Sequence, residues 1–392
     1  YQCSAHSGMV GTITINSNSD PSVTSIVLDE TTIAENGGIA IITATISAAH
    51  SKDVTIPLTV TGTSTIDIDY SSSYTNKGFT LIAGGNGMGS ASSQIATSYD
   101  IEFDSNGNLY IADHSNKRIS KWIPGQTQSP SIGTVVVENT HNMGIYIDDS
   151  DNLYVAEYYN NKVTKWAPGA SEGILVAGGN GQGSNNNQFY YPSYLLVDSS
   201  GNLYVSDYNN HRVMKWAPGA TEGIVVAGGN DLGSENNQLK NPNGLALDSS
   251  GNLYIADSGN NRIMKWSPGA SEGSVVLDES YSRKIIINSS DDLYFESGGN
   301  IKLLKSGSSS VINVVSSNSE SEVGAFTVFG FTIDSSGNYY IIDNNNFRVI
   351  KKHIRPEITI AAGATTGTIT FTGIDDSTYE LDETIIVTPS TS

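Results

Sequence analysis

The middle of the chain alternates short apolar runs with polar turns rich in Gly, Asn and Ser. The stretch from Gly244 to Leu277 shows the pattern most fully, with apolar runs at 244–248, 253–257, 262–266 and 273–277. Runs of about five residues, with a turn about every ten residues, are typical of all-β proteins. The pattern therefore predicts four short strands in this stretch, and no helical period competes with it.

This stretch is one copy of a repeat. The copies start at equivalent polar residues, with steps of 44, 50, 50, 40 and 46 residues between Asp104, Asp148, Asp198, Asp248, Asn288 and Asp334. A period of this size, with short strands inside each copy, indicates a radial or stacked array in which no copy can bury its own apolar surface. Four strands per copy favour the blade of a β-propeller.

The second strand and the turn before it carry further information. Leu253 and Ile255 lie on one side of the strand and Tyr254 and Ala256 on the other, so both faces have bulk, as expected of a sheet covered on both sides. The turn carries Gly in four copies and Asp151 or Asp291 in the other two, and Asp tolerates positive φ better than most residues.

An extra fourth strand precedes the first copy. Residues 79–85 match 173–179 and 223–229, whereas the last copy ends at Lys352 with no fourth strand after it. We therefore expect residues 79–85 to complete the sixth blade and to close the ring.

These residues resemble the NHL repeat family. Gly-Asn-Leu-Tyr-Val-Ala-Asp, Asn-Arg-Val and Val-Ala-Gly-Gly elements recur in order from Phe79 to Lys352, and the Trp-Asp signature of WD40 blades is missing. The resemblance implies a six-bladed propeller.

The segments before and after the repeat carry further strand patterns, too few on either side for a sandwich of their own. Together they resemble a Calx-β domain, through Ile33 to Gly38, Asp69-Tyr70, Ile358 to Phe371, Asp375-Asp376 and Leu381 to Ile386. The expected fold is all-β, a six-bladed β-propeller inserted into an immunoglobulin-like (Calx-β) β-sandwich. The expected domains are a cupredoxin C-terminal remnant at 1–20, the first sandwich part at 21–78, the propeller at 79–353, and the second sandwich part at 354–392 without its closing strand.

The first residues resemble the last loop and strand of a cupredoxin. In that family a Cys-x2-His-x2-Met loop binds copper, which corresponds here to Cys3, His6 and Met9. A blue-copper site also needs a second His, which in the family lies upstream. We therefore expect the chain to be a fragment of a longer, multi-domain protein, with copper relevant only in that context and an inert tail as the alternative.

A second group of candidate ligands is acidic. Hard oxygen ligands gathered at one end of a sandwich suit Ca²⁺, and the expected set is Glu35, Asp67, Asp69, Asp375 and Asp376. The Calx-β resemblance implies the same for Glu35, Asp69 and the acidic pair, although the family's terminal acidic cluster is missing. A solvated acidic rim is the alternative.

Repeated residues are better explained by structure than by chemistry. Second strands end on an acid, at Asp113, Glu157, Asp207, Asp257 and Asp343, and we expect these acids to bond turn backbone or the repeated Arg118, Arg212, Arg262 and Arg348. We likewise expect Trp122, Trp166, Trp216 and Trp266 to pack at the blade rims rather than to form a sugar-stacking row.

The histidines show no metal-binding spacing. His114 and His211 follow second strands in different blades, which leaves open a meeting at one face. Amidating lyases with zinc-binding His and gluconolactonases with acidic metal ligands use similar propellers, but neither ligand set can be matched here residue by residue. No nucleophile elbow, P-loop or dinucleotide fingerprint is present in the sequence.

Composition limits the partners. The 392 residues include 40 acidic and 20 basic side chains, a net charge of −20. A phosphate-binding surface needs Lys and Arg, so we expect no nucleic acid partner. No apolar run approaches about 18 residues, so we expect no membrane span. The Ser, Asn, Gly and Thr richness with low Lys is consistent with an extracellular or cell-surface bacterial protein, whose signal peptide is not present in this chain.

Two functional hypotheses follow. The first is a non-enzymatic binding or structural module of a large exported bacterial protein, with propeller loops that contact a protein or a glycan. The alternative is a metal-dependent hydrolase or lyase with its site at the propeller channel. Unlike polar groups that converge from different blades, together with a metal, would favour the enzyme. The sequence does not determine the oligomeric state.

Overall fold

The structure is a computed structural model. It describes residues 23–28, 39–46, 54–62, 70–72, 80–123, 132–279, 281–317, 325–334, 337–352, 357–360, 366–373 and 385–389. The chain divides into two compact units, one of residues 79–334 and 339–352 and the other of the remaining residues.

The larger unit is built from the predicted strands. The first strand of each blade is β6 (Ile101–Phe103), β10 (Asn142–Ile147), β14 (Pro192–Val197), β18 (Leu245–Leu247), β22 (Ile285–Ile287) or β26 (Gly330–Ile333). The second strands are β7 (Leu109–Asp113), β11 (Leu153–Glu157), β15 (Leu203–Asp207), β19 (Leu253–Asp257), β23 (Leu293–Ser297) and β27 (Tyr339–Asp343).

The outer half of each blade follows the same order. The third strands are β8 (Arg118–Trp122), β12 (Lys162–Trp166), β16 (Arg212–Trp216), β20 (Arg262–Trp266), β24 (Asn300–Leu304) and β28 (Arg348–Lys352). The fourth strands are β9 (Thr134–Glu138), β13 (Ile174–Gly178), β17 (Ile224–Gly228), β21 (Ser274–Asp278), β25 (Val311–Val315) and β5 (Thr80–Gly84).

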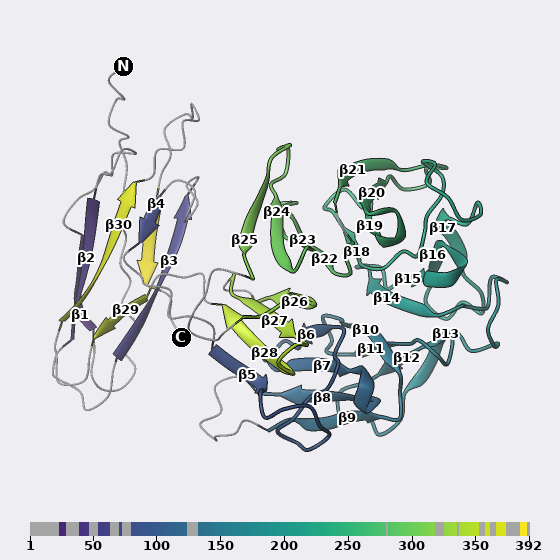
Figure 1. Ribbon diagram of the computed structural model, residues 1–392, viewed down its shortest axis with the longest axis horizontal. Helices are drawn as coiled ribbons and strands as arrows, with labels where there is room; N and C mark the ends of the chain where they lie inside the picture. The colour runs from purple at the N-terminus through teal and green to yellow at the C-terminus, as the bar shows by residue number, and fades with distance from the viewer. Residues whose placement is uncertain are drawn as a thin grey trace. The chain divides into compact units, whose positions relative to one another are not determined.

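These strands form six four-stranded antiparallel sheets arranged around a common centre (Figure 1). The first strand of each sheet is innermost. The last sheet has the order β26-β27-β28-β5, with Lys351 paired to Thr80 and Arg348 paired to Gly84. The prediction that residues 79–85 close the sixth blade is therefore confirmed, and so is the six-bladed β-propeller.

Both faces of the blades are covered, as the sequence indicated. Every residue of β11 and β27 is buried. Apolar side chains of adjacent blades share clusters, as where Ala256 and Ile263 of one blade pack with Ile285 and Phe295 of the next. No blade has a core of its own, because each depends on its neighbours for burial.

The turn after each first strand has the expected backbone. Gly251 has a φ of 77°, and Asp151 and Asp291, which replace Gly at this position, have φ values of 60° and 62°. The two Asp residues add a contact that Gly cannot make: Asp151 accepts bonds from Ser105 of the preceding blade, and Asp291 accepts them from Ser249. These bonds link adjacent blades.

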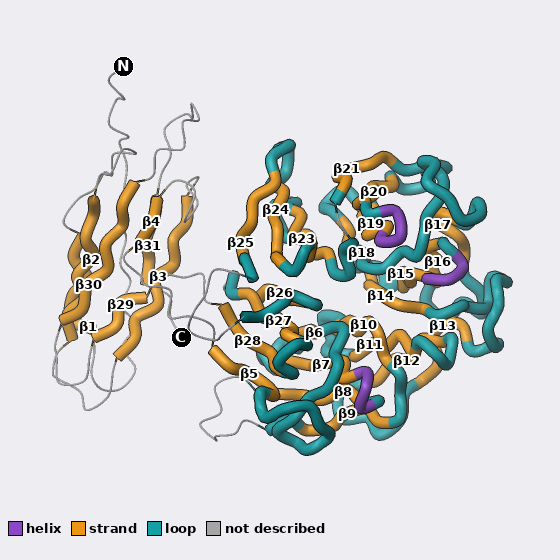
Figure 2. The backbone as a smooth tube through the Cα atoms, viewed as in Figure 1, coloured by secondary structure: helices purple, strands orange, loops and turns teal. Residues whose placement is uncertain are grey.

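Helical structure is minor in the described part of the chain (Figure 2). It consists of short 3-10 turns between second and third strands, η1 (His114–Asn116), η2 (Tyr208–Asn210) and η3 (Ser258–Asn260). No helix in the described ranges has the length and apolar character needed to cross a membrane.

The smaller unit joins strands from both sides of the propeller. It contains β1 (Val23–Leu28), β2 (Ile39–Ile46), β3 (Val54–Gly62), β4 (Tyr70–Ser72), β29 (Glu357–Ile360), β30 (Thr366–Gly373) and β31 (Ile385–Pro389). Their orders are β1-β2-β30-β4 and β29-β3-β31. Strands that lie before the propeller in the sequence thus pair with strands that lie after it.

Candidate functional site

The antiparallel order gives the propeller two different ends. The turns between first and second strands and those between third and fourth strands lie at one end, which we call the repeat end. The turns between second and third strands and the links from one blade to the next lie at the other, which we call the linker end.

The repeat end carries the same contacts in blade after blade. In the fourth blade, the Lys265 ammonium lies 3.1 Å from the Asp248 carboxylate and 5.0 Å from the centre of the Tyr254 ring. Equivalent Lys, Asp and Tyr side chains meet in the first, second, third and sixth blades. A device repeated in this way serves the fold.

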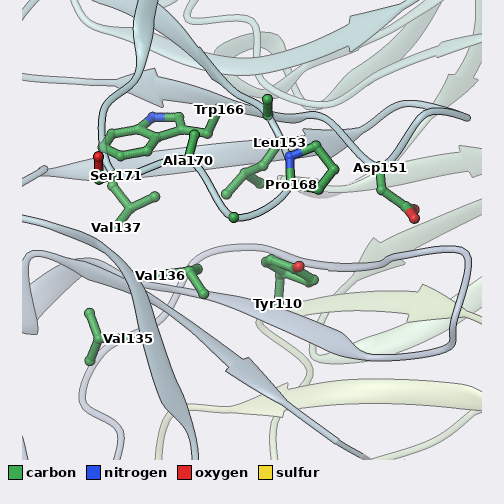
Figure 3. A pocket seen from close by; sticks show the side chains of 12 residues that line it. Tyr110, Val135, Val136, Val137, Asp151, Leu153, Trp166, Pro168, Ala170 and Ser171 are labelled. Atoms are coloured by element: carbon green, nitrogen blue, oxygen red, sulfur yellow. The ribbon is translucent and has the colours of Figure 1, made fainter.

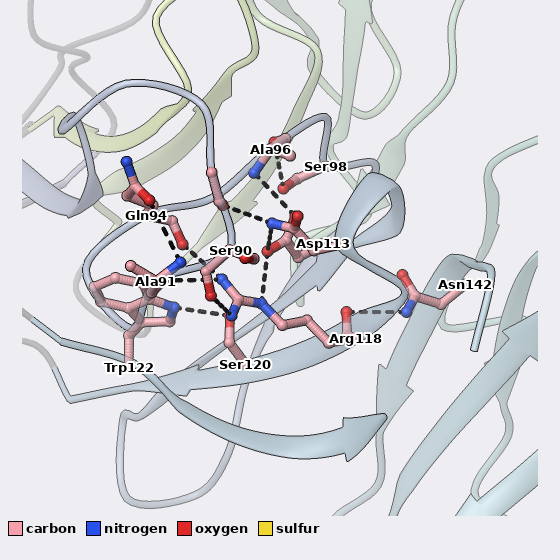
Figure 4. Close-up of polar contacts among 12 residues, drawn as sticks. Ser90, Ala91, Gln94, Ala96, Ser98, Asp113, Arg118, Ser120, Trp122 and Asn142 are labelled. Carbon is pink, nitrogen blue, oxygen red and sulfur yellow. Dashed lines mark hydrogen bonds and ion pairs between the residues drawn. The ribbon is translucent and has the colours of Figure 1, made fainter. Parts of the chain in front are cut away.

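The acid at the end of the second strand is also structural (Figure 4). Asp113 Oδ2 accepts from Arg118 Nε at 2.9 Å, and Asp113 Oδ1 accepts from the backbone N–H of Ala96 at 3.0 Å. Arg118 donates onward to the carbonyl oxygens of Ser90 and Gln94. The pair thus fastens the link that enters its blade.

We call this ion pair between the last residue of the second strand and the first residue of the third strand the Asp–Arg latch. It recurs at Asp207–Arg212, Asp257–Arg262 and Asp343–Arg348. The prediction that the repeated acids bond turn backbone or the repeated arginines is confirmed for the four Asp residues, whereas Glu157 bonds Asn160, Lys162 and Thr164 instead. The four latched blades follow the long links 85–100, 179–191, 229–244 and 316–329, whereas the short links 139–141 and 279–284 have no such latch. In the first, third and fourth blades the arginine also donates to carbonyl oxygens of the long link, so the latch holds that link in place.

The linker end carries the repeated latches, but its other side chains differ from blade to blade. Its side chains form a closed series of contacts that we call the aromatic circuit, namely Tyr99, His114, His141, Tyr158, Tyr159, Tyr191, Tyr208, Tyr281, Arg283 and Phe329. They come from five of the six blades and the links that enter them.

The first half of the circuit spans the sixth, first and second blades. Phe329 lies 5.5 Å from Tyr99 between ring centres, and Tyr99 meets His114 edge-on at 4.9 Å. His114 lies 5.5 Å from His141, which meets Tyr159 edge-on at 4.9 Å. Tyr159 is 51% exposed. An exposed aromatic face of this kind is a typical recognition surface.

The second half continues to the fifth blade. Tyr158 stacks on Tyr191 with ring centres 4.5 Å apart and contacts Tyr208 at 6.4 Å. Burial raises the pKa of Tyr208 to about 12, with a further contribution from its hydrogen bond to Tyr281. The fourth blade contributes Asn243, whose amide donates to the Tyr281 hydroxyl at 3.1 Å. At neutral pH this surface therefore offers neutral hydroxyls between aromatic faces.

Arg283 completes the circuit. The central carbon of its guanidinium lies 4.0 Å from the Phe329 ring centre and 4.8 Å from that of Tyr281. Its backbone N–H donates to Glu296 Oε2 at 3.2 Å. Burial raises the pKa of the Glu296 carboxyl to about 7, although the Arg283 charge opposes the shift.

Buried charges lie beside the circuit. Lys284 Nζ donates to Asp100 Oδ1 at 2.8 Å and also to Glu102. Burial raises the pKa of both carboxyls, and the lysine charge lowers it again only in part. The second Asp100 oxygen accepts the N–H of Ile145. This ion cluster ties the fifth blade to the first and second.

Three buried polar atoms at the linker end lack hydrogen-bond partners within the described residues, namely His141 Nδ1, Asn142 Oδ1 and Asp343 Oδ1. Burial lowers the pKa of His114 and of His141, so both imidazoles are neutral at neutral pH. Buried polar atoms without partners are uncommon and point to a site that water or a ligand satisfies.

The sequence left open a meeting of His114 and His211 at one face, but the structure gives these two histidines different partners. His114 lies against His141, and its Nδ1 bonds the carbonyl oxygen of Asn142 at 2.8 Å. His211 instead accepts the N–H of Asn241. The described ranges hold no group of three or more His, Cys, Asp or Glu side chains placed to bind a metal ion.

The tryptophans lie at the repeat end. Trp122, Trp216 and Trp266 are buried, which confirms that they pack at the blades. Trp166 is only partly buried and lines a cleft of about 360 Å³ between the first and second blades (Figure 3). Its indole N–H is bonded to Thr164, and Asp151 in the same cleft is bonded to Ser105. Most of the residues that line the cleft are apolar.

The metal ligands expected from the sequence lie outside the described residues. This holds for Glu35, Asp67, Asp69, Asp375 and Asp376 as calcium ligands, and for the copper loop of Cys3, His6 and Met9. Both sets remain predictions.

Sequence reasoning missed Arg283, Lys284, Asp100 and Glu296, although the repeat contains their signal. Asp100 and Lys284 occupy the repeat position four residues before the polar residue that starts each copy, where three other copies have Gly144, Gly244 and Gly330. Glu296 stands where Ala256 and its counterparts are small or apolar. Departures from the repeat, rather than its regular residues, mark the candidate site.

Comparisons with known proteins agree with the fold. The NHL repeat matches residues 189–216 and 239–266, so the chain carries NHL repeats. No curated protein matches the sequence. A protein of unknown function from Bacteroides thetaiotaomicron is 13% identical, with a TM-score of 0.57 over 88% of this chain and 100% of that one. A gluconolactonase from Xanthomonas campestris is 14% identical, with a TM-score of 0.53 over 67% of this chain and 87% of that one. Identities this low show the fold alone.

Proposed function

For a chain that carries NHL repeats in a six-bladed β-propeller, we propose a non-enzymatic recognition function in which the aromatic circuit binds a glycan. The observation that carries the proposal is the difference between the two ends. Repeated Lys, Asp and Tyr contacts stabilise the repeat end, whereas unlike side chains from successive blades converge at the linker end.

The chemistry of the circuit fits a sugar. A sugar ring presents C–H groups on its faces and hydroxyl groups around its edge. Aromatic faces such as those of Tyr158 and Tyr159 suit the first, and tyrosine hydroxyls suit the second. His141 Nδ1 and Asn142 Oδ1 supply polar atoms that have no partner within the described residues.

The test is a printed array of oligosaccharides of three to six units, neutral and acidic, probed with the full chain. We expect binding to a defined subset. Tyr159→Ala should weaken it by about three- to tenfold, because an aromatic contact contributes roughly 0.5–1.5 kcal/mol. Ile174→Ala is the control, since Ile174 is an equally accessible apolar residue, 63% exposed, on an outer strand. No binding, or equal losses in both variants, would contradict the proposal.

The second candidate is the hydrolase or lyase at the propeller channel. Glu296 favours it, because a buried carboxyl with a pKa of about 7 is suited to general acid–base catalysis. The metal-dependent form finds no ligand cluster in the part of the chain that the structure describes. The test is turnover of a panel of lactones and glycosides with and without divalent cations. Turnover abolished by Glu296→Gln would favour the enzyme over the binding module.

Three finer points complete the proposal. We propose that the chain belongs to an exported bacterial surface protein, that the unit flanking the propeller binds calcium through Glu35, Asp67, Asp69, Asp375 and Asp376, and that copper matters only within a longer parent protein. The support is composition and sequence resemblance. At calcium about 100 times its dissociation constant, the unit would gain roughly 2.7 kcal/mol of stability. An unchanged melting temperature in calcium and in chelator would contradict the calcium site.

A further inference from the structure

Arg283 differs from the other arginines of the propeller. Arg118, Arg212, Arg262 and Arg348 each pair with an acid at 2.7–2.9 Å. The guanidinium of Arg283 instead lies against the rings of Phe329 and Tyr281 and is partly buried. Within the described residues it makes no hydrogen bond and no ion pair through its side chain.

The neighbouring acids do not neutralise Arg283. Glu296 bonds its backbone N–H rather than its guanidinium, and the high pKa of that carboxyl makes it only partly ionised at neutral pH. Asp100 and Glu102 are bonded to Lys284. A guanidinium has five N–H donors, and a partly buried charged donor without an acceptor is costly. The aromatic circuit thus holds a cation prepared to receive an anion.

We propose that Arg283 binds the carboxylate of an acidic sugar whose rings lie on the tyrosines of the aromatic circuit. The inference rests on the proposed glycan recognition and specifies its ligand class. The planar guanidinium fork matches a carboxylate in a bidentate fashion, and the flanking rings of Phe329 and Tyr281 fix its orientation.

The surroundings favour a sugar with one carboxylate over an acidic peptide. Tyrosine hydroxyls of the aromatic circuit lie near Arg283, and such groups complement sugar hydroxyls. The net charge of −20 disfavours a ligand with many negative charges. A single guanidinium held between two rings matches a single carboxylate.

The experiment compares xylotriose that carries one glucuronic acid with the methyl ester of the same compound, by calorimetric titration of the full chain. We expect the acid to bind about 10- to 100-fold more tightly than the ester, because a charge-assisted bidentate pair at a partly desolvated site is lost in the ester. Arg283→Gln should reduce the affinity for the acid to that for the ester. Arg283→Lys should retain only part of the difference, because an ammonium lacks the planar fork.

The matched control is Lys117→Gln, which removes an exposed positive charge from the same end. It should change neither affinity by more than about twofold.

The outcomes separate the two proposals. Equal affinities of acid and ester for the native chain would overturn the role of Arg283 and leave glycan recognition intact. Failure of both compounds, together with a blank glycan array, would overturn both proposals. Binding of a peptide rich in Asp and Glu, lost in Arg283→Gln, would overturn the sugar class. If Arg283→Gln does not fold, the comparison of acid and ester on the native chain still decides.

Discussion

Replacing Arg262 by Met tests whether the Asp–Arg latches hold the propeller together. Met keeps much of the apolar stem of Arg and removes the guanidinium. Arg262 Nε donates to Asp257 Oδ2 at 2.7 Å, and its terminal nitrogens donate to the carbonyl oxygens of Ser234, Glu235 and Gln238. The variant removes all four bonds at once.

The magnitude follows from burial. The Asp257 side chain is fully buried and that of Arg262 is 7% exposed. Removal of one partner of a buried ion pair costs roughly 3–5 kcal/mol, because the other charge stays behind without compensation. Asp257 would keep its bonds from the Lys240 N–H and from Asn260, so we expect the lower part of that range.

Lys162→Met in the second blade is the matched control. Lys162 lies 3.4 Å from Glu157, but its side chain is 35% exposed and holds no link, so its removal should cost at most about 1 kcal/mol. Urea titration gives the free energy of unfolding of each variant. Hydrogen exchange of residues 229–244 should rise in Arg262→Met and stay unchanged in Lys162→Met. Equal losses of stability, or unchanged exchange in that link, would refute the reasoning.

Three further predictions concern charge and closure. Burial raises the pKa of Glu296 from 4.5 to about 7, so between these pH values the folded state holds a proton that the unfolded state has lost. The free energy of unfolding should therefore fall as pH rises through that window, and Glu296→Gln should abolish this fall in urea titrations at pH 4.5, 6 and 8. Lys284→Met should destabilise the chain by roughly 3–5 kcal/mol, and more at pH 8 than at pH 5, because the buried Asp100 and the partly buried Glu102 lose their counter-charge. An equal loss at both pH values would contradict this. Gly84→Ala should lower the melting temperature far more than Gly87→Ala, since both have positive φ but only at Gly84 would a methyl group meet the Phe347 carbonyl oxygen in the closing blade.

The propeller could be predicted from the sequence because the same pattern of residues occurs in copy after copy. Each copy shows the same apolar runs and turn residues, and the match of residues 79–85 to 173–179 shows how the ring closes. The Asp–Arg latch could be predicted for the same reason, since both residues recur at fixed positions.

The candidate site could not be predicted, because closure of the ring brings its members together from distant copies. Tyr99 and Phe329 are far apart in the sequence and touch only because the sixth blade adjoins the first. Arg283 and Glu296 lie in the copy that departs most from the repeat, where a search for regular residues does not find them. Reading the departures would have identified these residues, but not their partners.

The most direct test of the account is a crystal structure of the chain with xylotriose that carries one glucuronic acid. We expect sugar rings against Tyr158, Tyr159 and Tyr191, with the carboxylate within hydrogen-bonding distance of the Arg283 guanidinium. Sugar bound in the cleft beside Trp166, or anywhere else at the repeat end, would contradict it.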